Sequence, residues 1–131
     1  MGQHRSLAAH LTLTKTRRGI VARVTLRNTS PTEKTFLVQY NLPYTGKPYS
    51  SLFRIEPSAK YIGFMAKRPE VSWEDLEPLE PGEARECETI LEDSYRLPQG
   101  TIRVWYSASH DNPDHPREIL SVTSNVVEIE T

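Results

Sequence analysis

The sequence predicts an all-β protein: an antiparallel β-sandwich of seven to nine strands, in a single domain spanning residues 1–131. Short stretches in which apolar and polar residues alternate recur along the chain, as in strands with one buried face. Ten prolines and six glycines mark turns between these stretches. No stretch shows convincing amphipathic helical spacing, so two stacked sheets are the expected way to bury the apolar faces.

The first two predicted strands, residues 10–16 and 20–28, form a hairpin around the turn Arg17-Arg18-Gly19. In both strands the apolar residues occupy every second position, which places them on one face. These positions are Leu11 and Leu13 in the first strand, and Ala22, Val24 and Leu26 in the second. Residues 28–31 form a loop, since Pro31 cannot donate to a sheet ladder. We expect residues 1–8 to be flexible.

The middle of the chain predicts shorter strands. Residues 34–42 form the third and central strand, with Phe36, Val38 and Tyr40 on one face. Residues 52–55 and 60–65 are two short strands on either side of a turn at residues 56–59. Residues 69–81 combine three prolines with many acids, so we expect an exposed connection with at most one helical turn near residues 73–76.

The last part returns to longer strands at residues 82–91, 101–108 and 121–129, with a polar hairpin loop at residues 110–116. Between the first two of these strands, Tyr95 occupies the place of a tyrosine corner, whose hydroxyl ties down nearby backbone. This order of elements is typical of an immunoglobulin-like sandwich. Cys87 is the only cysteine, which excludes the disulfide-pinned antibody type. Its neighbours Glu86 and Glu88 favour an inert, protonated thiol.

Charge is separated along the chain although the formal net charge is only −1. Residues 1–35 hold seven basic residues and one acid, whereas residues 70–93 hold ten acids and one basic residue. The separation either steers a partner or covers the outer faces of strands that meet in the fold. Without an overall basic balance or a recognition helix, a nucleic-acid partner is not expected. No apolar run reaches the roughly 18 residues of a membrane span, so no membrane association is expected.

The first ten residues lack the apolar segment of a secretory signal, so we expect a cytoplasmic protein or a secreted one whose signal was removed. The oligomeric state stays open. Asn28-Thr29-Ser30 has the form of a glycosylation sequon, which matters only in a eukaryotic secretory setting.

Ligand-type side chains gather once, in the loop that holds His110, Asp111, Asp114 and His115. Imidazoles and carboxylates bind divalent cations, but the spacing matches no standard site and such residues are common at exposed hairpin tips. We therefore predict no metal and no cofactor, with these four residues as the candidates if a metal binds. The chain contains no H-E-x-x-H, G-x-S-x-G, P-loop or G-x-G-x-x-G motif, and we predict that it is not an enzyme.

An ordered series of short motifs resembles the immunoglobulin-like pro-domain that precedes the catalytic domain of deuterolysin-type zinc metallopeptidases, the aspzincins, which include the peptidyl-Lys metalloendopeptidases. The resemblance covers about three-quarters of the chain. Its motifs are Leu26-Arg27-Asn28-Thr29, Leu42-Pro43-Tyr44-Thr45-Gly46, Phe53-Arg54-Ile55, the stretch from Tyr61 to Arg68, Leu79-Glu80-Pro81-Gly82, the stretch from Leu91 to Tyr95, and Gly100-Thr101-Ile102-Arg103-Val104.

The resemblance implies a non-catalytic protein-binding module whose partner is a zinc metallopeptidase, acting as an inhibitor or folding aid. The family's catalytic module, with its H-E-x-x-H helix, has no counterpart in this chain, and the final residues read as a closing strand. Tyr61, Lys67, Arg68 and Trp73 are the candidate contact residues, because aromatic and arginine side chains are common interface anchors. Alternatively, Tyr61 and Trp73 belong to the core, and the two cations offset the acids that follow. The other functional alternative is a structural or adhesion-type sandwich without a peptidase partner.

Overall fold

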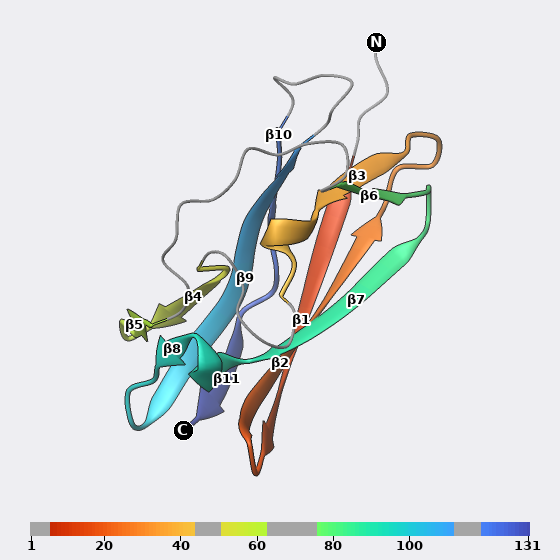
Figure 1. Cartoon of the computed structure of the whole chain (residues 1–131). Coiled ribbons are helices and arrows are strands. Elements are labelled where there is room, and N and C mark those ends of the chain that lie inside the picture. Colours follow the sequence, from red (N-terminus) through yellow and green to blue (C-terminus); the bar gives the residue numbers. More distant parts are fainter. Residues whose placement is uncertain (1–5, 44–50, 63–75, 112–118) are drawn as a thin grey trace.

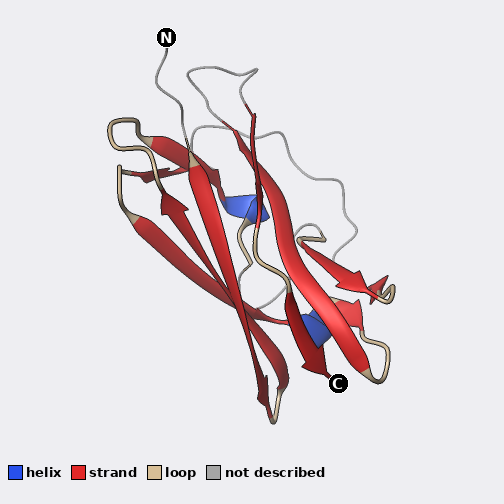
Figure 2. Ribbon diagram, turned by 180° about the vertical axis from the view of Figure 1, so that it is seen from behind, coloured by secondary structure: helices blue, strands red, loops and turns tan. Residues whose placement is uncertain are grey.

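The structure is a computed structural model that describes residues 6–43, 51–62, 76–111 and 119–131. It confirms the predicted all-β antiparallel sandwich, shown from two sides in Figures 1 and 2. One of the two larger sheets has the order β1-β2-β7, and the second is built on β9, which pairs with β4, β10 and β11; two further sheets in the described part of the chain have two strands each. The first sheet comprises Leu7–Thr16, Gly19–Asn28 and Ala84–Ile90; β9 is Thr101–Asp111, and its partners are Phe53–Glu56, Ile119–Thr123 and Val127–Glu130.

The first hairpin follows the predicted pattern. β1 pairs with β2 around a turn at residues 17–18, and β1 begins at Leu7, three residues before the predicted start. The inward positions of β2 are at most 2% exposed, and they pack against inward residues of β9 in one core. These core residues are Ile20, Ala22, Val24 and Leu26 on β2, and Ile102, Val104 and Tyr106 on β9. Strict alternation explains why the sequence located this pair correctly.

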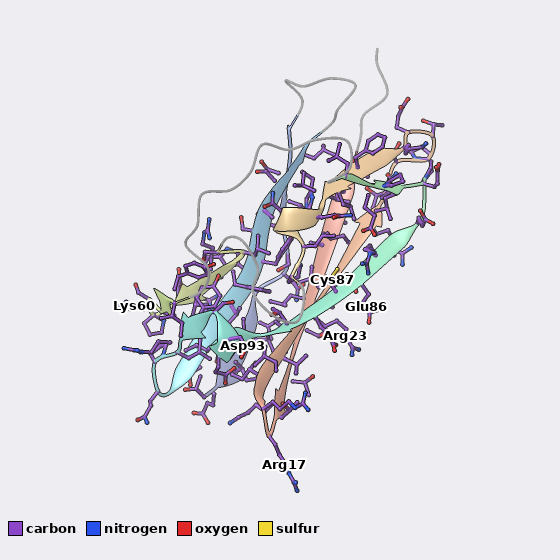
Figure 3. The ribbon with its side chains drawn as sticks, in the orientation of Figure 1. Arg17, Arg23, Lys60, Glu86, Cys87 and Asp93 are labelled. Atoms are coloured by element: carbon purple, nitrogen blue, oxygen red, sulfur yellow. The ribbon has the colours of Figure 1, made fainter. Side chains whose placement is uncertain are left out.

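Part of the charge separation is resolved by strand pairing. Arg23 on β2 lies opposite the acidic strand β7, with its guanidinium nitrogens 3.3 Å from Glu86 and 3.0 Å from Glu88. Figure 3 shows Arg23 and Glu86 near each other on this sheet. Basic and acidic segments that are distant in sequence therefore cover one outer face. All three side chains are about half exposed, so the pairs contribute little stability.

A one-residue bulge divides the predicted closing strand into β10 and β11. Thr123 pairs with Ser107 and Val127 with Val104, so residues 124–126 face only residues 105 and 106 of β9. Ser124 stabilises the bulge, since its N–H donates to the carbonyl of Tyr106 (2.9 Å) while its hydroxyl accepts the N–H of Tyr106 (2.8 Å). The extra residue breaks the alternation that predicted a continuous strand.

Asn125 in the bulge ties the two sheets together. Its side-chain oxygen accepts the N–H of Leu11 (2.8 Å), and its amide nitrogen donates to the carbonyl of Leu11 (3.1 Å). The amide group thus takes the place of a neighbouring strand at one residue of β1. This contact fixes the separation of the sheets halfway along β1.

The prediction of a central third strand is wrong. β3 (Thr35–Val38) pairs only with β6 (Leu76–Leu79) among the described residues, and the short helix η1 (Gln39–Asn41) follows it. Leu37 and Val38 are both buried, and the strand ends at Val38 rather than continuing to residue 42 as predicted. The connection expected over residues 69–81 contains β6 in its described part. Pro78 is compatible with that strand since β6 has a single partner.

A buried asparagine closes the end of the sandwich at which β2 finishes. The amide nitrogen of Asn28 donates to the carbonyls of Glu33 (2.8 Å) and Leu79 (2.9 Å), and its side-chain oxygen accepts the N–H of Ser30 (3.0 Å). Asn28 is fully buried. One side chain thus joins the end of β2, the loop before β3, and β6. We call this end the closed end.

Tyr95 stabilises the half of the sandwich away from Asn28. Its hydroxyl does not bind backbone in its own segment, as a tyrosine corner would, but backbone elsewhere in the chain. Tyr95 begins the two-residue strand β8 (Tyr95–Arg96), which follows η3 (Leu91–Asp93) and pairs with β5 (Lys60–Tyr61). Its hydroxyl accepts the N–H of Phe53 (3.0 Å), donates to the carbonyl of Phe53 (3.2 Å), and lies 2.7 Å from the Ser51 hydroxyl. The predicted hydroxyl anchor therefore holds β4, which is distant in the chain.

Candidate functional site

The candidate site is an open cleft of about 710 Å³ at the end of the sandwich opposite Asn28. We call it the end cleft. The turn of the β1–β2 hairpin forms one wall, and the chain around η3, β8 and the start of β9 forms the other. Ile20, Ile62, Tyr95 and Leu97 supply apolar surface. Ile62 is 46% exposed, one of two large apolar side chains so exposed among the described residues.

Glu92 in η3 shapes the hairpin wall of the end cleft. One of its carboxylate oxygens accepts the N–H of Ile20 at 2.8 Å, across 72 residues of sequence. Gly19 beside it has φ +130°, a conformation that residues with a Cβ rarely adopt. A Cβ at Gly19 would lie 2.6 Å from the same carboxylate. The sequence needs glycine here both for the turn and for the close approach of Glu92.

The remaining charge in the end cleft is positive. Lys15 and Arg96 line it from opposite walls, and neither forms an ion pair with any described residue. Arg17 and Arg18 follow at the hairpin turn, where Figure 3 shows Arg17 pointing away from the body of the molecule. By contrast, Lys34 and Arg85 each have a carboxylate partner. Lys15, Arg17, Arg18 and Arg96 therefore place four basic side chains at this end of the sandwich that form no ion pair with a described residue.

The outer edge of β1 adjoins the end cleft with unpaired backbone groups. β1 is an outer strand of its sheet, and the N–H and C=O of Leu11 point away from β2 toward Asn125. Backbone groups alternate in direction along a strand, so those of Leu13 and Lys15 point to the same edge. No described strand pairs with this edge beyond Asn125. Unpaired edges of this kind are sites at which an added strand can bind, and here β11 lies beside β1 without pairing to it.

Only one of the sequence-predicted contact residues falls in the described part of the chain. Tyr61 is half-buried in β5, with its ring centroid 5.5 Å from that of Tyr95 and an interplanar angle of 63°. Burial, and secondarily Tyr95, raises the pKa of Tyr61. Tyr61 therefore packs onto the fold next to the end cleft, as the core alternative predicts for it. Lys67, Arg68 and Trp73 lie outside the described residues.

His110, the first metal candidate, is a fully buried residue of β9 rather than part of an exposed loop. Its Nδ1 accepts the N–H of Val38 (2.9 Å), and its Nε2 lies 3.2 Å from the hydroxyl of Tyr106. That hydroxyl donates to the carbonyl of Asn41 (2.5 Å), so the bonding pattern assigns the proton to Nε2 of a neutral imidazole. Both ring nitrogens are therefore engaged within the protein.

The other members of the metal prediction stay untested. Asp111 ends β9 with its side chain outside the described part, and Asp114 and His115 lie wholly outside it. Among described residues, no group of three His, Cys, Asp or Glu side chains is arranged to hold a metal ion. The described helices are also too short and too polar to cross a bilayer.

The asparagine of the sequon and the single cysteine are both buried in the fold. Asn28 donates its amide hydrogens to two backbone carbonyls, so the folded chain does not present it for glycosylation.

Cys87 is buried on β7. Burial is the main reason that the pKa of its thiol is raised; Glu77 and Glu86 raise that pKa further, and Arg85 lowers it. A protonated, buried thiol agrees with the prediction of an inert cysteine.

No protein-family model matches this chain, and no curated protein does either. The end cleft and its cations were missed at the sequence level, where Arg17-Arg18-Gly19 indicated only a turn. Lys15 and Arg96 are 81 positions apart, and nothing in the local pattern of either predicts that they line one cleft.

Proposed function

We propose that this protein is a non-catalytic protein-binding module, and that a zinc metallopeptidase of the deuterolysin type is its partner. The observation that carries the proposal is the end cleft, which combines exposed apolar surface with cations and a strand edge that have no ion-pair or strand partner in the described part of the chain. These are the elements with which a sheet protein binds an extended segment: backbone bonds supply affinity and side-chain contacts supply choice. The choice of a peptidase as partner rests on the motif resemblance.

Mechanistically, the module acts by occlusion. The edge of β1 and the cleft hold a segment of the peptidase that borders its substrate groove, and the bound sandwich then blocks access to that groove. Binding of this kind needs no covalent step, and the sandwich is well suited to it because β1 is held by β2 along its other edge. An inhibitor and a folding aid share this contact, since both bind the folded peptidase surface.

The test is a titration of the purified chain against a purified deuterolysin-type endopeptidase with a fluorogenic peptide substrate. We expect saturable inhibition at one chain per enzyme, with the chain recovered intact. The heat-unfolded chain is the control for simple substrate competition. Absence of inhibition, or inhibition that disappears as the chain is cleaved, contradicts the peptidase partner and favours the structural or adhesion-type alternative.

The contact residues predicted from the sequence have a separate test. Alanine replacement of Lys67, Arg68 and Trp73 together should weaken inhibition if they form the contact surface. If affinity for the peptidase is unchanged, these residues are not the contact surface, and the described surface has to supply it.

A further inference from the structure

We infer that the end cleft binds an extended acidic segment of a partner protein, which pairs with the free edge of β1 at Leu13 and Lys15. The inference rests on the proposed binding function but specifies the site and the chemistry of the ligand. It concerns residues that the sequence did not single out.

The backbone determines where the segment lies. Asn125 already occupies the outward N–H and C=O of Leu11, so an added strand has to pair beyond that point, toward the hairpin turn. Leu13 and Lys15 are the next residues whose backbone groups point to this edge. An added strand there runs directly into the end cleft, which Lys15 lines. The bound segment is short, because Asn125 limits it at one side and the turn at the other.

The charges determine the sign of the ligand. Lys15 and Arg96 approach the segment from the two walls, and neither is neutralised by a described residue. Among the described residues that line the cleft, Glu92 has the one acidic side chain, and its carboxylate is turned toward the hairpin backbone and accepts the N–H of Ile20. An acidic residue in the segment is attracted by both Lys15 and Arg96, whereas a basic residue is repelled by both.

The apolar surface determines the pattern of the segment. Successive side chains of an extended strand point to opposite faces. A segment on the β1 edge therefore directs every second side chain into the end cleft, where Ile62 and Leu97 offer apolar surface for contact. The matching ligand alternates apolar and acidic residues. Strand β7 of a second copy is a poorer occupant, because its acids already face Arg23.

The experiment uses a fluorescein-labelled octapeptide of alternating Glu and Val, titrated with the full chain and followed by polarisation. Two related peptides test the chemistry: one has Lys in place of Glu, and the other has N-methylated Val to remove alternate N–H donors. We expect binding of the acidic peptide only, at least tenfold weaker for each of the other two. In ¹H–¹⁵N spectra, the amide signals of Leu13 and Lys15 should shift on binding.

The decisive variant is Lys15→Glu with Arg96→Glu, which should weaken the acidic peptide at least tenfold. Its matched control is Arg54→Glu with Arg103→Glu, which makes the same charge change at exposed positions on β4 and β9 that do not line the cleft. The control should weaken binding less than twofold. Thermal melts of both variants report whether either has lost its fold.

Three outcomes overturn the inference: equal weakening by both double variants, equal binding of the Lys peptide, or a change in oligomeric state that depends on Lys15 and Arg96, which assigns the cleft to a second copy. The result is separable from the peptidase test. Peptide binding without peptidase inhibition keeps this site and rejects the proposed partner. Peptidase inhibition that Lys15→Glu with Arg96→Glu leaves unchanged keeps the partner and rejects this site.

Discussion

The two ends of the sandwich are built in opposite ways. At the closed end, Asn28 directs three side-chain hydrogen bonds to backbone groups and is fully buried. At the end cleft, Lys15 and Arg96 form no ion pair with a described residue, and the apolar side chain of Ile62 is exposed. The buried hydroxyls of Thr89 and Ser94, toward this end, have no hydrogen-bond partner among the described residues. The closed end satisfies the polar groups of Asn28 within the fold, whereas the end cleft presents exposed apolar surface and basic side chains that form no ion pair with a described residue.

The contrast teaches where substitutions should affect stability and where they should affect binding. Changes at the closed end leave buried polar groups without partners, which costs much more than the average value of a hydrogen bond. Changes to Lys15 and Arg96 remove no ion pair with a described residue. They should therefore alter ligand binding and leave the free energy of unfolding nearly unchanged.

The largest effect is expected for Asn28→Ala. The change leaves the carbonyls of Glu33 and Leu79 and the N–H of Ser30 without their partner, so it should lower the free energy of unfolding by about 3 kcal/mol. Urea unfolding measures this. The exposed neighbour Thr29→Ala is the control and should cost less than about 1 kcal/mol. Similar losses for the two variants would show that Asn28 does not hold the closed end.

A smaller loss is expected at the open end for Gly19→Ala. The backbone at φ +130° and the approach of the Glu92 carboxylate together should cost about 2 kcal/mol. Gly100→Ala is a matched comparison, since Gly100 also has positive φ (108°) but a Cβ there meets nothing within 4 Å. Thermal unfolding of the two variants should show the larger loss for Gly19→Ala. Equal losses of stability would mean that the Glu92 side chain moves aside without lowering the free energy of unfolding.

The smallest effect concerns alkaline pH and compares Tyr106 with Tyr95. Burial raises the pKa of both phenols in the folded state, and Tyr106 is the more deeply buried. Their contribution to stability is therefore complete below the unfolded pKa of about 10 and is lost as pH rises through the folded values. One unit above that unfolded value, Tyr106, which stays un-ionised in the fold, should cost about 1.4 kcal/mol.

Tyr106→Phe should remove part of this alkaline loss, by about 1 kcal/mol between pH 9 and pH 11. Its own cost at neutral pH, from the lost bond to the carbonyl of Asn41, is separate and independent of pH in this range. Tyr95→Phe should have a smaller effect on the slope. Urea unfolding at pH 7, 9 and 11 measures all three proteins, and an unchanged slope for Tyr106→Phe would contradict the prediction.

The predictability of the fold differed between regions for a physical reason. β1, β2 and the first half of β9 alternate because each has one face on the core and one in solvent, so their pattern located them. β3 and β6 were misjudged because both are short, and β3 is buried at adjacent positions. Pro78 also argued against a strand at β6. The bulge at Ser124 was missed because one inserted residue leaves the composition of a strand unchanged.

The functional residues were less predictable than the fold. His110 attracted a metal hypothesis because its neighbours in sequence are polar, yet its neighbours in space are Val38 and Tyr106. Lys15 and Arg96 attracted none, because a single cation in a strand is ordinary. Tyr95 was recognised as an anchor, but its partner Phe53 was not, since a hydroxyl leaves no trace in the sequence of the backbone that it binds.

By itself, the order of apolar and polar residues determined that this chain forms antiparallel strands with one core, because burial of every second side chain is a local property of the backbone. The tertiary structure alone decided which ends of those strands meet. Contacts between Asn28 and Leu79, Glu92 and Ile20, or Asn125 and Leu11 join residues far apart in the chain. Such contacts depend on how the sheets are stacked, and they decide that one end of the molecule is sealed while the other stays open to a ligand.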